Sequence, residues 1–335
     1  GSGSTSLGSG FLVAPDVLLT ASHVVDALSF GTGKLERGQA IVDFRGYLRS
    51  PGTDKREVLE VISSDSHLDL SLLRLSPQTE NNERHHILSL DGLAPTVGGP
   101  VCVVGYPLAD PRNSIAFVSI IFSNQFGVKR ASLGEIIAIE DEVCFHDCST
   151  LGGNSGSPIF DIHTGLICGV HLGGRAFIRN DAIPVSIARK FVTQSLNPSS
   201  LFSKTQRNKK MADKRPSFDK YFLELQDKDP DLKAEMDAAM DEMASTESTE
   251  GSANQFTRET IVLTKGRPVL DIKQGAAVIE FNEVESQIWK SRLVSANSLL
   301  LPNIPSVGRI EVANHPRGVE WLGTGWLIRD NIVVT

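Results

Sequence analysis

The sequence contains little cysteine, few large aromatic side chains and no long apolar run. Its 335 residues include four Cys, three Trp and three Tyr. Four cysteines are too few to hold a chain of this length together by disulfide bonds. The longest apolar runs are far shorter than the ~20 residues that a membrane-spanning helix needs. These shortages argue against a disulfide-built fold, and we expect no membrane partner.

Positive charge is also in short supply. The chain has 33 Lys+Arg against 40 Asp+Glu, a formal net charge of −7. Without an excess of basic residues, no nucleic-acid partner is expected. The composition, with 40% hydrophobic and 22% charged residues, is typical of a globular protein. The start, Gly1–Ser4, resembles a cloning scar rather than a secretory signal. Together with the few cysteines, this predicts a cytoplasmic location.

Short apolar runs separated by turn residues dominate the chain from Gly8 to about Val192. Runs of this kind, bounded by Gly, Pro, Asn or Asp, predict the β-strands of a sandwich or barrel. In Pro184–Val192 the apolar residues recur at helical spacing and predict a closing helix. We therefore predict an all-β domain over residues 8–196 that ends in a helix.

The composition changes over residues 197–260. A basic run is followed by an acidic, amphipathic stretch and then by the small polar residues Ala244–Ser252. Two interpretations stay open. The segment is either a solvated, partly helical linker or it carries a helix that docks on a partner or regulates the domain.

An internal repeat lies near the two ends of the chain. Leu7–Thr20 aligns without gaps with Leu322–Thr335, 315 positions later. The repeat predicts that residues 261–335 are the N-terminal part of a second, incomplete unit, whose own catalytic residues would lie beyond Thr335. Two alternatives remain. The two segments are unrelated hairpins with a shared pattern, or residues 261–335 supply strands to the first unit, in cis or from another molecule.

Three segments of the first unit carry residues suited to nucleophilic catalysis. His23 follows a strand-like run, Asp69 directly precedes another, and Ser155 lies in the glycine loop Leu151–Pro158. A serine hydroxyl becomes a good nucleophile when a neutral imidazole takes its proton. That imidazole needs a carboxylate on its other nitrogen. Asp65 competes with Asp69 for this role, but it lies before the strand rather than at its start.

The glycines of the same loop predict an oxyanion hole. Gly152 and Gly153 let the backbone turn so that the amides of Gly153 and Ser155 point at one spot. The loss of one donor from such a site costs ~3–4 kcal/mol of transition-state stabilisation.

The order His23, Asp69, Ser155, together with Thr20-Ala-Ser-His and Gly153-Asn-Ser-Gly-Ser-Pro, resembles the chymotrypsin/trypsin-like serine protease family. The bacterial glutamyl-endopeptidase and HtrA-like branches are particularly similar, and the resemblance covers about residues 8–195. It implies two six-stranded antiparallel β-barrels with the triad between them. It also implies that His23 is the general base, that Asp69 orients it and that Ser155 is the nucleophile. Lipases and esterases with the order Ser, Asp, His are excluded.

The resemblance also locates a substrate pocket. In this family the residues just before the nucleophile and the strand after it line the pocket for P1, the residue before the cleaved bond. Here these residues are Ser149, Thr150, His171, Gly173 and Gly174. The pocket has no Asp at its base, which argues against cleavage after Arg or Lys. His171 opposite Thr150 resembles glutamyl endopeptidases and viral 3C-type proteases, which predicts Glu at P1 with Gln or Asp next. The alternative is a histidine that only fills the barrel.

No cofactor or metal site is indicated, because the other histidines show no metal-ligand spacing with Cys or carboxylates. Cys144 and Cys148 just before the glycine loop could form a disulfide or a redox control, but we favour two buried small side chains.

The residues therefore predict a serine endopeptidase that acts on protein or peptide substrates through an acyl-enzyme. A regulatory partner or a second protease unit is left open as its control. Glu247-Ser248 and Glu250-Gly251 in the linker would be self-cleavage sites for a Glu-specific enzyme. The alternative function is a latent protease fold that serves as a binding module in a larger protein.

Overall fold

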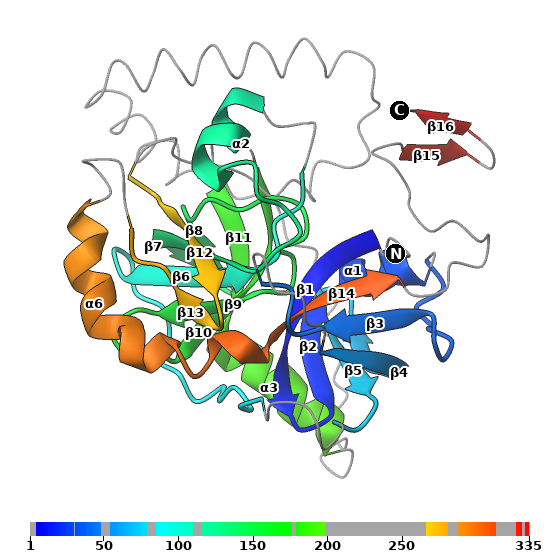
Figure 1. Ribbon diagram of the computed structural model, residues 1–335. Coiled ribbons are helices and arrows are strands. Elements are labelled where there is room, and N and C mark those ends of the chain that lie inside the picture. The colour runs from blue at the N-terminus through cyan, green and yellow to red at the C-terminus, as the bar shows by residue number, and fades with distance from the viewer. Residues whose placement is uncertain are drawn as a thin grey trace.

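Two β-barrels stand side by side in the computed structural model (Figure 1). The structure describes residues 5–29, 31–47, 54–78, 85–109, 115–175, 179–197, 266–280, 287–312, 326–329 and 332–334. The predicted linker, residues 197–260, lies outside these ranges except for Asn197. Within them, no helix has the length and apolar character needed to cross a membrane.

The first barrel is a closed ring of six antiparallel strands. In ring order these are β1 (Thr5–Ala14), β14 (Val307–Val312), β3 (Ala40–Asp43), β4 (Lys55–Asp65), β5 (Leu70–Leu75) and β2 (Val17–Ala21). Its interior is filled by alternating branched side chains such as Leu18, Val42, Leu73 and Ile310, all fully buried. The short helix α1 (Ser22–Leu28) follows β2 and packs its apolar face on the same core.

The second barrel has the strand order β7, β6, β9, β10, β11, β8, and pairing of β7 with β8 closes the ring. Its strands are β6 (Pro100–Gly105), β7 (Arg130–Glu140), β8 (Val143–His146), β9 (Pro158–Asp161), β10 (Ile167–Arg175) and β11 (Arg179–Pro184). Helix α2 (Ile115–Phe122) lies between β6 and β7, and α3 (Val185–Leu196) follows β11 as predicted. The prediction of two six-stranded barrels with a closing helix is confirmed.

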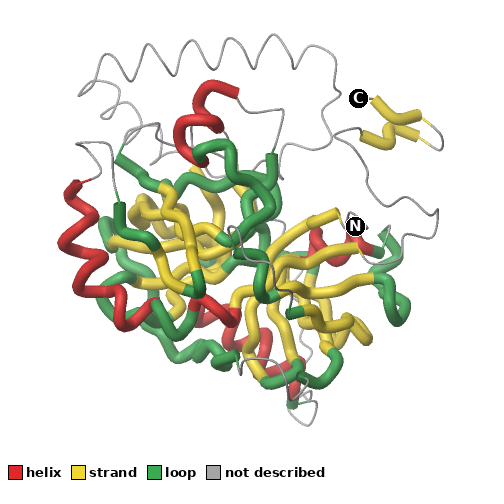
Figure 2. Tube along the Cα trace, in the orientation of Figure 1, coloured by secondary structure: helices red, strands yellow, loops and turns green. Residues whose placement is uncertain are grey.

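Residues 266–312 pack onto this unit, so the prediction that they begin a separate second unit is wrong. Strand β12 (Val269–Lys273) pairs with β7 at the edge of the second barrel and with the short β13 (Ala276–Ala277). Helix α6 (Ile288–Leu300) and the 3-10 turn Ile304–Ser306 then lead into β14. Figures 1 and 2 show this segment running from the second barrel to the first. The structure instead agrees with the alternative in which this segment supplies strands to the first unit in cis.

Strand β14 is an integral part of the first barrel. It pairs with β1 on one side and β3 on the other. Val307 and Ile310 are fully buried, and each aliphatic side chain of this kind contributes roughly 1.5–3 kcal/mol. The buried Lys129 Nζ donates hydrogen bonds to the carbonyls of Phe44 (3.0 Å) and Ile304 (2.8 Å). This lysine, which precedes β7 of the second barrel, therefore holds the turn before β14 against the first barrel.

The two repeated hairpins have the same strand register. In the first, Phe11 pairs with Leu19, and in the hairpin of β15 (Trp326–Arg329) and β16 (Ile332–Val334) the matching Trp326 pairs with Val334. The register shift after Leu12 recurs at the same position after Leu327. The repeat seen in the sequence is therefore also a repeat of backbone pairing. The assignment of this hairpin to a further unit stays a prediction.

All four cysteines are buried free thiols. Burial raises the pKa of Cys102 and of Cys144 to about 12. Cys144 and Cys148 pack in one apolar cluster of the second barrel. The interpretation of this pair as small core side chains is confirmed.

Candidate active site

His23 and Asp69 meet at the end of the first barrel where β2 and β5 lie side by side. His23 is the second residue of α1, which directly follows β2, and Asp69 directly precedes β5. The His23 Nδ1 and Asp69 Oδ2 atoms are 2.7 Å apart. The other carboxylate oxygen accepts the Ser22 hydroxyl (2.7 Å) and the His23 backbone N–H (3.0 Å). Both oxygens are therefore fixed, and the imidazole has one orientation.

The Asp69 side chain is held as a carboxylate. Burial by itself would raise its pKa, but the hydrogen bonds from His23 and Ser22 and the interaction with the His23 charge outweigh it, and the pKa lies below its ordinary value. A carboxyl group whose pKa is lowered on folding stabilises the fold above its unfolded pKa of about 3.9. This stabilisation is lost only as the pH falls through the lower folded pKa. The group is thus ionised throughout the neutral range.

Ser155 comes from the second barrel, in the loop between β8 and β9. Its Oγ is 2.7 Å from His23 Nε2 and 2.8 Å from the Leu172 carbonyl oxygen. A hydroxyl has one proton to donate. When neutral His23 accepts that proton, the site is set for proton transfer. When His23 is protonated, Nε2 becomes the donor and the hydroxyl proton goes to Leu172.

Hydrogen bonds to two carbonyls of the loop around Ser155 fix the direction in which its N–H groups point. The Leu108 N–H donates to the Gly152 carbonyl (2.6 Å), and the Ser157 N–H donates to the Asn154 carbonyl (2.9 Å). In a trans peptide the N–H points opposite to the C=O. The N–H groups of Gly153 and Ser155 therefore point away from these two donors. Gly153 has a φ of +95°, and a Cβ there would lie 2.4 Å from the Tyr106 carbonyl oxygen, so only glycine fits.

His171, a predicted P1-pocket residue, forms a buried pair with His146. The Cys148 N–H donates to His146 Nδ1 (3.3 Å), and His146 Nε2 is 3.0 Å from His171 Nδ1. Burial, and then the proximity of His171, lower the pKa of His146 well below its ordinary value. Neutral His146 with an accepting Nδ1 carries its proton on Nε2 and donates to His171. With Nδ1 as the acceptor, His171 carries its own proton on Nε2.

The other predicted pocket residues are held by the neighbouring strand and by the C-terminal segment. The Thr150 hydroxyl donates to Asn180 Oδ1 (3.0 Å), and the Asn180 amide donates to the Cys148 carbonyl (2.8 Å). Gly173 and Gly174 of β10 pair with Asp181 and Asn180 of β11. The structure thus connects Thr150 to Asn180 and His171 to His146.

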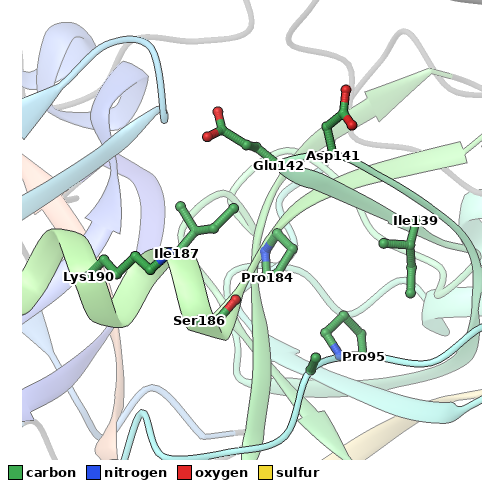
Figure 3. A pocket seen from close by; sticks show the side chains of 9 residues that line it. Pro95, Ile139, Asp141, Glu142, Pro184, Ser186, Ile187 and Lys190 are labelled. Atoms are coloured by element: carbon green, nitrogen blue, oxygen red, sulfur yellow. The ribbon is translucent and has the colours of Figure 1, made fainter. Parts of the chain in front are cut away.

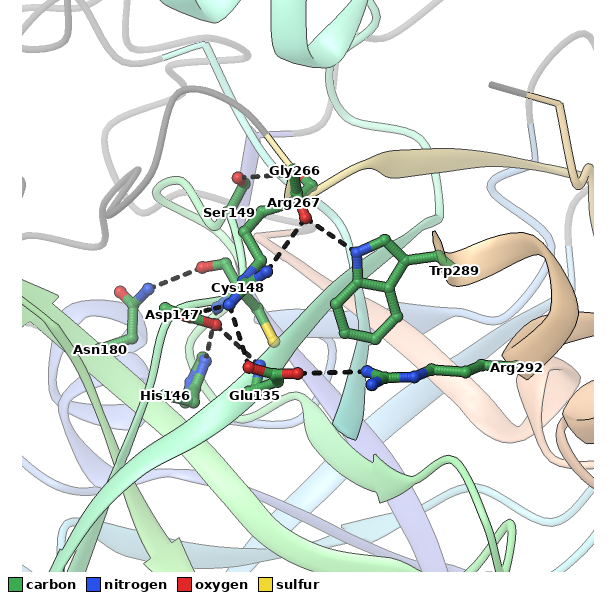
Figure 4. A network of polar contacts seen from close by, with 10 residues as sticks. All are labelled: Glu135, His146, Asp147, Cys148, Ser149, Asn180, Gly266, Arg267, Trp289 and Arg292. Atoms are coloured by element: carbon green, nitrogen blue, oxygen red, sulfur yellow. Dashed lines mark hydrogen bonds and ion pairs between the residues drawn. The ribbon is translucent and has the colours of Figure 1, made fainter. Parts of the chain in front are cut away.

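Arg267 clamps the C-terminal segment beside Ser149 (Figure 4). Its backbone carbonyl accepts the Ser149 hydroxyl (3.3 Å). Its guanidinium donates to the buried Asp147 (2.7 Å) and to Glu135 (3.3 Å). Ser149 is thereby covered by a residue from outside the first 200 residues of the chain, a contact that the sequence does not predict.

Sequence reasoning missed His146 and Asn180. Their signal was the strand pairing of β8 with β11, which places Asn180 opposite His146. The competitor Asp65 accepts the N–H groups of His67 (2.9 Å) and Leu68 (3.0 Å). It shapes the turn before Asp69, and its hydrogen bonds do not involve His23.

A separate pocket of about 350 Å³ lies beside the start of α3 (Figure 3). Asp141 and Glu142 from the β7–β8 turn and Lys190 of α3 are among its lining residues. None of its lining residues is a predicted site residue. The remaining lining residues are Ala94, Pro95, Ile139, Pro184, Ser186 and Ile187.

The sequence of the chain is similar to those of known peptidases. Residues 8–170 match the family model of the trypsin-like peptidase domain. The glutamyl endopeptidases of Staphylococcus aureus strains MW2 and MSSA476 are each 27% identical over 197 residues, which cover 57% of this chain and 54% of each relative. The chain thus spans about half the length of these relatives. Residues 8–170, which contain His23, Asp69 and Ser155, thus match the trypsin-like peptidase domain family.

Proposed function

We propose that this protein is a serine endopeptidase in which Ser155 is the nucleophile, His23 the general base and Asp69 the residue that orients it. The observation that carries the proposal is the unbroken path of contacts from Asp69 Oδ2 through the His23 ring to Ser155 Oγ, each 2.7 Å long. Such a path joins the nucleophile to its base, and the base to the group that fixes its tautomer.

The first half of the reaction forms an acyl-enzyme. Ser155 Oγ attacks the carbonyl carbon of the peptide bond while its proton passes to His23 Nε2. The oxyanion that develops accepts hydrogen bonds from the Gly153 and Ser155 N–H groups. When the C–N bond breaks, the leaving amine takes the proton from His23. The carboxylate of Asp69 stabilises the imidazolium that exists between the two transfers.

The second half releases the product. A water molecule attacks the ester carbonyl, and His23 Nε2 accepts its proton. As the bond to Ser155 breaks, the proton returns from His23 to Oγ. The enzyme is restored, and one water has been consumed for each peptide bond cleaved.

A fluorophosphonate probe tests this proposal. Its phosphorus is attacked by an activated serine oxygen with loss of fluoride, so we expect a single adduct on the native chain. Tandem mass spectrometry should place it on Ser155, whereas the neighbouring Ser157 serves as an internal control. Heat-denatured protein should remain unlabelled. A native chain that takes no probe would instead support the latent binding module.

Glu is the proposed P1 preference. His171, with its proton on Nε2 when His146 donates to Nδ1, offers a hydrogen-bond donor to a side-chain oxygen. A hydrogen bond to a charged acceptor is worth about 1.5–3 kcal/mol, more than one to an amide. This difference favours Glu, with Gln and Asp next. The curated relatives named glutamyl endopeptidase support the same preference.

A peptide panel that varies only P1 tests the preference. We expect the highest kcat/KM for Glu, and His171→Ala should lower it by roughly 10–100-fold, the value of one such hydrogen bond. Fluorophosphonate labelling of His171→Ala should proceed as in the wild type, because His171 is not in the triad. Faster cleavage after Lys or Leu than after Glu would contradict the assignment.

Self-cleavage in the linker is a further part of the proposal. Glu247-Ser248 and Glu250-Gly251 present the proposed P1 residue within a run of small polar residues. We also propose that the substrates are proteins or peptides, because the proposed reaction cleaves peptide bonds. A regulatory partner or a second protease unit is proposed as the control of this enzyme.

A further inference from the structure

We propose that Ser9, in the first barrel, is a positioning residue that holds the oxyanion loop of the second barrel, residues 151–157, in its active conformation. This inference rests on the proposed function, because it concerns the amides of Gly153 and Ser155. Strand β1, which carries Ser9, lies on the side of its barrel nearest the second barrel in Figure 1.

Ser9 is fully buried and bonded through its backbone and its side chain. Its N–H donates to the Ser155 carbonyl (2.9 Å), and its hydroxyl donates to the Gly153 carbonyl (2.7 Å). The hydroxyl oxygen also accepts the Tyr106 N–H (3.1 Å). The Thr20 hydroxyl donates to the Ser9 carbonyl (2.7 Å) and so fixes Ser9 itself. One small side chain thus joins β1, the residue after β6 and the oxyanion loop.

The hydrogen bond from the Ser9 hydroxyl to the Gly153 carbonyl acts on the peptide between the two that supply the oxyanion amides. The peptides 152–153 and 154–155, which supply the two oxyanion amides, are anchored through their carbonyls by Leu108 and Ser157. The peptide between them, 153–154, is anchored at its carbonyl by the Ser9 hydroxyl and at its N–H by the Leu151 carbonyl (3.1 Å). A rotation of this middle peptide would turn both amides. Gly153 has no Cβ to resist that rotation, so hydrogen bonds supply the restraint, and Ser9 supplies the one that comes from outside the loop.

The packing around Ser9 leaves room for a short side chain. A Cβ on the adjacent Gly8 would lie 2.6 Å from Val24 Cγ2 and 3.2 Å from the Ser155 carbonyl oxygen. Strand β1 therefore runs directly against the loop. In the repeated segment the matching position is Thr324, also between two glycines. The hydroxyl is the feature that both copies retain, and a threonine can supply it.

Ser9→Ala and Ser9→Thr form a matched pair for the test. Ser9→Ala removes the donor to Gly153 and the acceptor of the Tyr106 N–H, whereas Ser9→Thr retains the hydroxyl. For Ser9→Ala we expect kcat on a P1-Glu peptide to fall by about 10–100-fold with KM changed less than about threefold, a part of the effect of losing an oxyanion donor. For Ser9→Thr we expect kcat within about threefold of the wild type.

Binding of a transition-state analogue separates positioning from a general structural role. A peptide boronic acid forms a tetrahedral adduct with Ser155 and places a hydroxyl at the oxyanion amides. We expect its inhibition constant to rise in Ser9→Ala by the same factor by which kcat/KM falls. The affinity of the cleaved P1-Glu product, which forms no adduct, should change less than about threefold.

Three results would overturn the inference. These are a wild-type kcat in Ser9→Ala, an equal loss in Ser9→Thr, or an unchanged boronate affinity. Should Ser9→Ala fail to fold, Ser9→Cys takes its place, since a thiol is a weaker hydrogen-bonding group; an intermediate kcat supports the inference and a wild-type kcat overturns it. A wild-type chain that neither cleaves the peptide nor takes the fluorophosphonate would contradict the proposed function instead.

Discussion

Ser155→Ala should lower kcat on a P1-Glu peptide by about 10⁶-fold, the loss found when a protease triad loses its nucleophile. The hydroxyl that contacts His23 Nε2 at 2.7 Å disappears, and no acyl-enzyme can form. The residual rate reflects the oxyanion amides and substrate binding alone. Initial rates over long incubations with concentrated enzyme measure the difference.

The same variant tests self-cleavage in the linker. Intact-mass spectrometry of the wild type should show cuts after Glu247 or Glu250, and Ser155→Ala should remain whole. Ser186→Ala is a suitable control, because this serine lines the separate pocket beside α3. A Ser155→Ala protein that is still cut would assign the cleavage to another enzyme. An active wild type that stays whole would refute self-cleavage.

Asp69→Asn should lower kcat by about 10⁴-fold with little change in the fold. Asn keeps an oxygen for the Ser22 hydroxyl and the His23 N–H, and it tolerates the left-handed backbone found here, where φ is +52°. Its amide, however, donates to His23 Nδ1. The imidazole then carries its proton on Nε2 and faces Ser155 with a donor where an acceptor is needed.

Asp65→Asn is the matched control for this prediction. It lies in the same turn, and the oxygen that accepts the His67 and Leu68 N–H groups is retained. We expect kcat within about threefold of the wild type and an unchanged melting temperature. A 10⁴-fold loss in Asp65→Asn rather than in Asp69→Asn would transfer the orienting role to Asp65.

The contacts of the proposed triad were predictable because their signals are local. His23 and Asp69 each stand where a strand meets a turn, and Ser155 lies in a glycine loop, so short stretches of sequence were enough to identify them. The strand pattern likewise predicted barrels and the helix after β11. Each of these inferences needs no knowledge of which distant segment lies nearby.

The position of β14 was not predictable in this way. Its alternation predicts a strand but does not say which sheet receives it. One reason that β14 joins the first barrel is the buried Glu311. Its carboxylate accepts a hydrogen bond from Lys55, which lies 256 residues earlier in the chain. His146 was missed for a related reason. Its role depends on His171 of β10, which is separated from β8 by β11, and on the backbone N–H of Cys148. Neither contact is visible as a motif.

The placement of β14 changes what a cut in the linker would do. Residues 266–312 hold a barrel strand, the clamp on Asp147 and the cover of Ser149. Cleavage near residue 250 would therefore yield a nicked, two-chain enzyme rather than a discarded fragment. The tether that keeps the two pieces at high effective concentration would be gone. Refolding after denaturation would become bimolecular, so an enzyme that recovers easily before the cut would recover only in concentrated solution after it.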